Sequence, residues 1–98
     1  MTSSGPRGFE FRLHSRRVQR ELDQLRQPDY SRVLGAMHAL AGEPSPPGCK
    51  KLYDNVFRVR VGAWRIVYRI DNDRERIEIG AVRWRTERTY KRLEDLFS

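Results

Sequence analysis

Basic and apolar side chains alternate along residues 57–70, on both sides of Gly62-Ala63. This alternation is typical of two half-buried strands joined by a tight turn. If Gly62 occupies the first central position of a type II′ turn, Arg60 lies directly opposite Arg65. Two like charges at that spacing oppose folding by about 0.2 to 1 kcal/mol. A protein that keeps such a pair without a nearby acid is expected to bind an anion there, and phosphate is the natural candidate.

A wider set of residues can converge on the same end of the predicted sheet. Its arginines can neutralise charge that develops on a phosphoryl group, and its tyrosine is a candidate base because neighbouring positive charge favours the phenolate. RNA cleavage by attack of a ribose 2′-hydroxyl on its own phosphate needs these groups. The competing interpretation is that the arginines are solvated and the tyrosine packs in the core. The set comprises Arg58, Arg60, Arg65, Arg83, Arg85 and Tyr90.

The predicted register separates the arginines of the hairpin into two kinds. A second turn around residues 71–74 sets Glu78 opposite Arg69, which neutralises that arginine. The same register sets Val82 opposite Arg65. The arginine pair at the first turn is therefore left without an acid, and all the hairpin arginines are expected on one exposed face.

Further side chains are candidates for contact with RNA. An aromatic ring beside arginines can stack on a base, although a tryptophan at the edge of a sheet more often packs against its neighbours. The candidates are Lys50, Lys51, Arg58, Arg69 and Trp84.

The histidines and the cysteine are not expected to contribute to catalysis or to metal binding. His14 and His38 fall in different predicted elements, and each lacks a partner for catalysis. Cys49 is the only cysteine, which excludes an internal disulfide and fits a reducing compartment. It has no cysteine or histidine partner at metal-ligand spacing, so the sequence predicts neither a metal nor a cofactor.

Hydrophobic periodicity predicts the elements that position these residues. Ser15 is the expected N-cap of a first helix, and Pro28 ends its pattern. Asp29 is the expected cap of a second helix with a wider apolar stripe, which ends at Gly42. The expected elements are a strand over residues 9–13, helices over 16–26 and 29–42, a loop over 43–48, a meander of three strands beginning at residue 57, and a short helix after residue 86.

These elements predict an α+β fold, in which two antiparallel N-terminal helices pack on a twisted antiparallel sheet of about four strands, followed by a short C-terminal helix. The 98 residues suffice for one small domain, expected over residues 9–98, with residues 1–8 as a disordered tail.

The charge of the chain limits its partners. Twenty lysines and arginines against thirteen aspartates and glutamates give a net charge of +7, which favours nucleic acid or an acidic protein as partner. The first eight residues lack the apolar run of a signal peptide, and no stretch approaches the ~20 apolar residues of a membrane span. A soluble, cytoplasmic protein with no membrane partner is therefore expected.

Several segments together resemble the RelE/ParE superfamily of bacterial toxins, and more closely its RelE branch. They are Lys51-Leu52, the alternating run at residues 57–70, the run Ile-Gly-Ala-Val-Arg-Trp-Arg at residues 79–85, and Tyr90 beyond it. The resemblance covers residues 9 to about 92, and its most specific part is the Gly-x-Trp-Arg-Ile-Val-Tyr run. It implies a compact α+β domain and an antitoxin partner that wraps the domain and blocks its basic surface.

The resemblance also implies a site. Members of the RelE branch cleave mRNA in the ribosomal A site with basic residues and a tyrosine. Carried over by position, Arg58 and Arg60 match two basic strand positions, Arg65 matches the arginine after the hairpin, and Tyr90 matches the tyrosine. The remaining arginine is matched by either Arg83 or Arg85.

One departure from the family pattern affects the chemistry. The two strand positions are commonly lysine in the enzymes and are arginine here. Arginine does not exchange protons near neutral pH. In a nuclease, Arg60 would therefore act by its charge, and Tyr90 would carry more of the proton transfer.

The leading hypothesis is thus a RelE-like toxin, an endonuclease that cleaves mRNA on the ribosome by 2′-hydroxyl attack and is inhibited by an acidic antitoxin. Its partners would be the antitoxin, the message and ribosomal RNA. The ParE branch inhibits DNA gyrase without that site, so a gyrase inhibitor is the alternative. A member that only binds its antitoxin is a third possibility.

Overall fold

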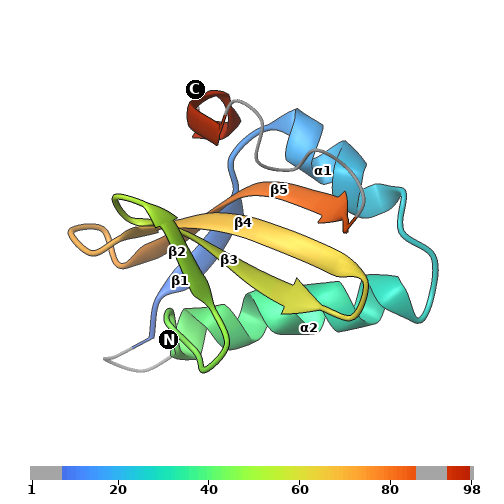
Figure 1. Ribbon diagram of the computed structural model, residues 1–98, viewed down its shortest axis with the longest axis horizontal. Helices are drawn as coiled ribbons and strands as arrows, with labels where there is room; N and C mark the ends of the chain where they lie inside the picture. Colours follow the sequence, from blue (N-terminus) through green and yellow to red (C-terminus); the bar gives the residue numbers. More distant parts are fainter. Residues whose placement is uncertain (1–7, 86–92, 98) are drawn as a thin grey trace.

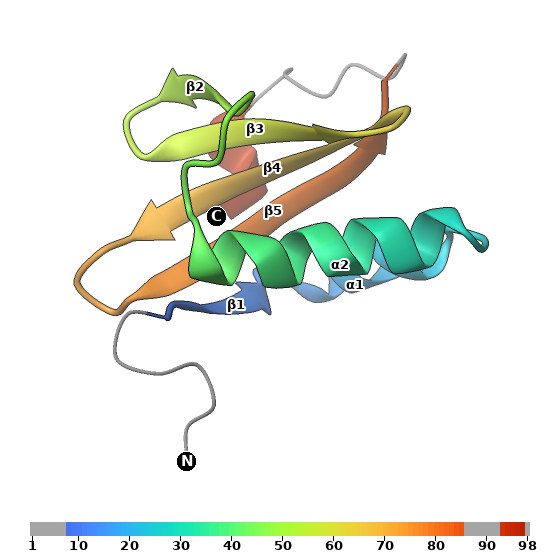
Figure 2. The same cartoon turned by 90° about the horizontal axis from the view of Figure 1, so that it is seen from below.

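The computed structural model describes residues 8–85 and 93–97 (Figure 1, Figure 2). Of the predicted tail, only Gly8 belongs to this part of the chain. In chain order the elements are β1 (Glu10–Leu13), α1 (Arg16–Asp23), α2 (Asp29–Gly42), β2 (Lys50–Tyr53), β3 (Val56–Val61), β4 (Trp64–Asp71), β5 (Arg76–Trp84) and the 3₁₀ helix η1 (Leu93–Phe97).

The predicted α+β class is confirmed, whereas the predicted sheet differs in two respects. The sheet has five strands in the order β1-β5-β4-β3-β2. β2 was missed because it is a four-residue edge strand with a register shift between Lys51 and Tyr53. The sheet is also mixed, since β1 pairs in parallel with β5. Parallel neighbours need a long crossover connection, and here the two helices and strands β2 to β4 lie between β1 and β5 in the sequence.

The main core lies between the helices and one face of the sheet, called here the helix face. The apolar stripes of both helices are buried as predicted, with Val18 and Leu22 in α1 and Met37 in α2 almost fully enclosed. They pack against sheet residues such as Ile66 and Ile79, which are also fully buried. Figure 2 shows α2 crossing this face. No helix in the described ranges is long and apolar enough to cross a membrane.

The two predicted helix caps have different outcomes. Ser15 does occupy the N-cap position of α1, but its hydroxyl makes no capping hydrogen bond. Asp29 is the first residue of α2 and Pro28 precedes it at the N-cap, so the predicted Asp29 cap is wrong. The Asp29 carboxylate instead accepts a hydrogen bond from the Trp64 indole N–H at 3.0 Å. This bond ties the start of α2 to the start of β4.

The hairpin of β3 and β4 has the predicted register. Val61 pairs with Trp64 and Arg60 pairs with Arg65. Gly62 has φ of +60°, whereas Ala63 is not among the residues with positive φ. A type II′ turn requires positive φ at its first central position alone, which glycine adopts without strain.

A bulge changes the predicted register of β4 with β5. Tyr68 pairs with Ile79 and Arg69 with Glu78, as predicted, but the register shifts between Val67 and Tyr68. Val67 therefore pairs with Ala81, and Gly80 is the extra residue of the bulge. The predicted pairing of Val82 with Arg65 is wrong for this reason. A bulge inserts one residue and so exchanges the two faces of the strand that follows it.

A second, smaller core lies on the opposite face of the sheet, called here the arginine face. It contains Val56, Val67 and Ala81, and it is covered by Leu96 of η1. Figure 1 shows η1 and α2 on opposite sides of the sheet. The expected C-terminal helix is thus represented by this short 3₁₀ helix. Residues 86–92, where that helix was predicted to begin, lie outside the described residues.

Candidate anion-binding face

Three arginines from three adjacent strands form a row across the arginine face, called here the arginine row. Arg60 of β3 pairs with Arg65 of β4, which in turn pairs with Arg83 of β5. Directly paired residues on neighbouring strands place their side chains on the same face, within about 5.5 Å at Cα. Arg83 joins the row only because the bulge at Gly80 exchanges it for Val82. The bulge therefore adds a third positive charge to the predicted pair.

Two members of the arginine row have no carboxylate partner among the described side chains. Among the side chains that the structure describes, those of residues 8–85 and 95–97, neither Arg60 nor Arg65 forms an ion pair. Arg60 is exposed, and Arg65 is half-buried, with its Nη1 donating to the Trp64 carbonyl oxygen at 3.3 Å. The predicted pairing of the two arginines is confirmed, and no described acid compensates it. Such a pair attracts anions because the two positive potentials add.

Arg83, in contrast, is held by a carboxylate from α1. Its Nε donates to Oε2 of Glu21 at 3.1 Å, and its Nη2 lies 3.0 Å from the same oxygen. Glu21 Oε1 accepts the backbone N–H of Val82 at 2.9 Å. A third contact comes from Arg17, whose Nη1 lies 3.0 Å from Oε2. Glu21 thus joins the helix to the end of β5.

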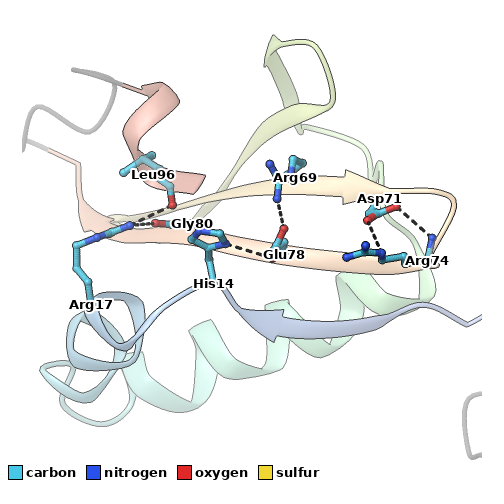
Figure 3. A network of polar contacts seen from close by, with 8 residues as sticks. All are labelled: His14, Arg17, Arg69, Asp71, Arg74, Glu78, Gly80 and Leu96. Carbon is cyan, nitrogen blue, oxygen red and sulfur yellow. Dashed lines mark hydrogen bonds and ion pairs between the residues drawn. The ribbon is translucent and has the colours of Figure 1, made fainter. Parts of the chain in front are cut away.

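Side chains and backbone groups around α1 occupy the edge of β5 that β1 leaves open. β1 ends at Leu13, which pairs with Ile79. The next hydrogen bond is from the His14 N–H to the Ile79 carbonyl at 2.9 Å. Arg17 Nη2 then donates to the Gly80 carbonyl at 2.9 Å, and also to the Leu96 carbonyl of η1 at 3.2 Å (Figure 3). Side chains of α1 therefore form hydrogen bonds with the backbone of β5 beyond the point where β1 ends.

Arg58 contradicts the expectation that the hairpin arginines share an exposed face. It is only 7% exposed. Its partner Val67 belongs to the second core, under Leu96 and Phe97, so this part of the face is covered. The buried Nε of Arg58 has no hydrogen-bond partner among the described residues. Arg58 shares the face with the arginine row, but it is not open to a large ligand as the sequence indicated.

Arg69 is neutralised as predicted. It forms an ion pair with Glu78, and Glu78 Oε2 also lies 3.2 Å from His14 Nδ1 (Figure 3). The ring of Phe97 lies over this group, with its centroid 4.8 Å from Cζ of Arg69 and 5.6 Å from the His14 ring. Here His14 has a structural role that joins β1, β5 and η1.

The decline in the free energy of unfolding at acid pH is expected to depend on Glu78. Burial raises the pKa of its carboxyl, but hydrogen bonds from Arg69 and His14 outweigh burial and lower the pKa below its ordinary value. A carboxyl with a lowered pKa in the folded state stabilises that state above the unfolded pKa of about 4.3. This contribution is lost as the pH falls through the folded pKa. Glu78→Gln is expected to flatten the decline in unfolding free energy between about pH 5 and 3.

Urea unfolding at a series of pH values measures this slope. Glu10→Gln, which removes an exposed carboxylate from β1, is the control and should keep the wild-type slope. If the unfolding free energy of Glu78→Gln fell as steeply with decreasing pH as that of the wild type, Glu78 would not be responsible for this decline.

The remaining candidates for RNA contact are distributed over both faces. Lys50 pairs with Arg58 and so lies on the arginine face, whereas Lys51 pairs with Phe57 of the helix face. Trp84 pairs with Trp64 on the helix face, where the two rings meet edge to face at 5.2 Å. Trp84 is therefore not on the same face as the arginine row, although it is 38% exposed.

Other predicted residues are placed as follows. Arg85 is exposed just beyond β5, and its backbone N–H donates to the Ala63 carbonyl at 2.9 Å. Tyr90 lies outside the described residues. His38 of α2 contacts the ring of Phe11 at 4.8 Å. No cluster of metal-ligating side chains occurs in the part of the chain that the structure describes.

The sequence analysis missed Glu21, Arg17 and Gly80. The spacing of Arg17 and Glu21 by four residues is a common helical ion pair and gives no sign of a distant partner. A glycine inside a strand pattern does suggest a bulge, and Gly80 could have been recognised on that ground.

Comparison with known proteins identifies the class. Residues 13–89 match the family described as the ParE toxin of the type II toxin-antitoxin system parDE. Because this match spans most of the chain, the protein belongs to that family and is a toxin of a type II toxin-antitoxin system within the RelE/ParE superfamily. No curated protein matches the chain.

Solved structures similar to this chain include RelE toxins and complexes of RelE with RelB. The toxin–antitoxin complex RelBE2 of Mycobacterium tuberculosis is 27% identical with a TM-score of 0.68, and the match covers 80% of this chain and 99% of that one. The archaeal RelE–RelB complex of Pyrococcus horikoshii is 21% identical with a TM-score of 0.70, covering 82% and 98%. The isolated RelE toxin of Escherichia coli is 12% identical with a TM-score of 0.68, covering 90% and 92%.

Proposed function

We propose that this toxin is an endonuclease that cleaves mRNA on the ribosome in the cytoplasm. The observation that carries the proposal is the pair Arg60 and Arg65, which face each other at the end of a hairpin without a carboxylate among the described residues. A ligand with closely spaced negative charges would relieve the repulsion between them. The RNA backbone is such a ligand.

The arginine row supplies the charge stabilisation that the reaction requires. When a ribose 2′-hydroxyl attacks the adjacent phosphate, negative charge grows on the phosphoryl oxygens, and guanidinium donors can stabilise it. The proposal therefore needs no metal or cofactor. Arginine does not exchange protons near neutral pH, so Arg60 and Arg65 act by charge and hydrogen bonding. Tyr90 is proposed as the base that accepts the 2′-hydroxyl proton.

We infer that an antitoxin binds the same surface. The solved relatives from Mycobacterium tuberculosis and Pyrococcus horikoshii are complexes of a toxin with an antitoxin. The net charge of +7 favours an acidic partner segment. Such a segment would compete with RNA for the arginine row, because carboxylates and phosphates form the same paired hydrogen bonds with guanidinium groups.

A second candidate function is inhibition of DNA gyrase. It is favoured by the match to the ParE toxin family, whereas the solved structures compared above carry the names RelE and RelBE2. In that case the arginine row would contact DNA or the gyrase protein and would perform no chemistry.

One experiment separates the two candidates. The toxin is expressed briefly in bacteria, mRNA 5′ ends are mapped, and gyrase supercoiling is assayed in extracts of the same cells. The proposed nuclease is expected to produce new 5′ ends within translated codons, and Tyr90→Phe should remove them. Intact messages with inhibited supercoiling would instead assign the protein to the gyrase inhibitors.

A further inference from the structure

We propose that Glu21 is a positioning residue that orients Arg83 toward the phosphate bound by Arg60 and Arg65. This inference rests on the proposed nuclease function. It assigns a role to a carboxylate of α1, which lies outside the sheet that carries the arginine row. Glu21 would not touch the RNA, and it would act through Arg83.

The contacts of Arg83 explain how its orientation is fixed. Nε and Nη2 both meet Oε2 of Glu21, at 3.1 and 3.0 Å. A guanidinium held by two of its nitrogens cannot turn freely about the Cδ–Nε bond. The remaining N–H groups, on Nη1 and on the second position of Nη2, are left for another acceptor. Side chains of both residues are largely covered, at 23% exposure for Arg83 and 18% for Glu21, so the pair is less mobile than a surface ion pair.

The carboxylate orients Arg83 without cancelling the charge of the site. Oε2 of Glu21 is shared with Arg17 Nη1 at 3.0 Å. One negative charge therefore lies between two positive ones, and the three side chains together carry a net charge of +1. A phosphate that approaches the arginine row still meets a positive potential.

The backbone contact of Glu21 links this orientation to the bulge. Oε1 accepts the Val82 N–H at 2.9 Å, directly beside Arg83 and two residues beyond Gly80. Glu21 thus binds the strand and the arginine with separate oxygens. A glutamine can keep only part of this arrangement, because it has one oxygen and its amide group would meet the guanidinium or the N–H as a second donor.

The test measures Glu21→Gln on purified protein, with ribosome-bound message in single-turnover reactions. The cleavage rate constant per folded molecule is expected to fall about tenfold, while the half-saturating ribosome concentration changes less than about twofold. Thermal unfolding establishes the folded fraction of each variant. Asp23→Asn is the matched control, because Asp23 lies on the same helix, is exposed, and accepts a hydrogen bond from Gln19 instead of a strand residue.

Two further variants show whether Glu21 acts through Arg83. In an Arg83→Gln background, adding Glu21→Gln should cause no further loss of rate. Arg83→Lys keeps the charge but lacks the two-nitrogen contact, and it should lose about as much rate as Glu21→Gln. This second variant keeps the proposal testable if Glu21→Gln does not fold.

Each other outcome overturns the inference in a different way. If the wild type cleaves and Glu21→Gln cleaves within twofold of it or faster, Glu21 does not position Arg83 and the nuclease function stands. Full additivity of the two substitutions would mean that Glu21 acts independently of Arg83. If the wild type cleaves no message, the proposed function fails and the inference fails with it.

Discussion

Arg65→Gln is expected to remove most of the toxic activity and, at the same time, to make the folded protein slightly more stable. Cleavage should fall about 100-fold, because one charged donor to the phosphoryl group is lost. The free energy of unfolding should rise by a few tenths of a kcal/mol, because the substitution relieves the repulsion between Arg60 and Arg65. Urea unfolding and cleavage of ribosome-bound message measure the two effects.

A control on the same strand and the same face separates this prediction from a general effect of removing arginine. Arg69→Gln breaks the ion pair with Glu78, and it is expected to lower the unfolding free energy by up to about 1 kcal/mol. The two substitutions should therefore change stability in opposite directions. A loss of stability in Arg65→Gln, or unchanged toxicity, would contradict the role given to the arginine row.

Gly80→Ala is expected to destabilise the protein by about 1 to 3 kcal/mol by displacing Phe97. A Cβ at position 80 would lie 2.5 Å from Cζ and 2.7 Å from Cε1 of the Phe97 ring. The ring cannot stay in place at these distances. Its displacement also disrupts the contacts with Arg69 and His14 that hold η1 to the arginine face.

A double-mutant cycle shows whether Phe97 is the cause. In a Phe97→Ala background, Gly80→Ala should cost less than about 0.5 kcal/mol, because the methyl group then has room. Gly35→Ala is the control for the general effect of replacing glycine. Gly35 lies within α2, and a Cβ there would meet nothing within 4 Å. This control should stabilise the protein by about 0.5 to 1 kcal/mol. Equal losses from Gly80→Ala in both backgrounds would exclude the proposed clash.

The hairpin was predictable because all its determinants are local. Alternation selected the strands, and Gly62 selected the turn, which fixed the pairing of Arg60 with Arg65. Glu78 was assigned to Arg69 correctly because that pair lies before the bulge, where counting from the second turn still holds.

The third arginine of the row could not be predicted in the same way. The bulge at Gly80 shifts the strand by one residue, so Arg83 replaces Val82 opposite Arg65. Counting residues from the turn gives no sign of this shift. The reason for glycine at this position is the ring of Phe97, which belongs to a segment 17 positions further along the chain.

The exposure of the arginines was likewise decided by distant segments. Arg58 and Arg60 are two positions apart in the same alternating run, so they look equivalent in the sequence. The second core beneath η1 buries Arg58 and leaves Arg60 exposed. Burial depends on what packs over a face, and alternation reports only which residues share that face.

Helix and strand periods and turn chemistry act over a few residues, so the two helical stripes, the hairpin and its facing arginine pair could be predicted from the residues alone. The parallel pairing of β1 with β5, the place of Arg83 in the arginine row and its contact with Glu21 are properties of the folded chain. These features depend on contacts between residues as far apart as Glu21 and Arg83. Their formation requires the closure of long loops, to which no local pattern is sensitive.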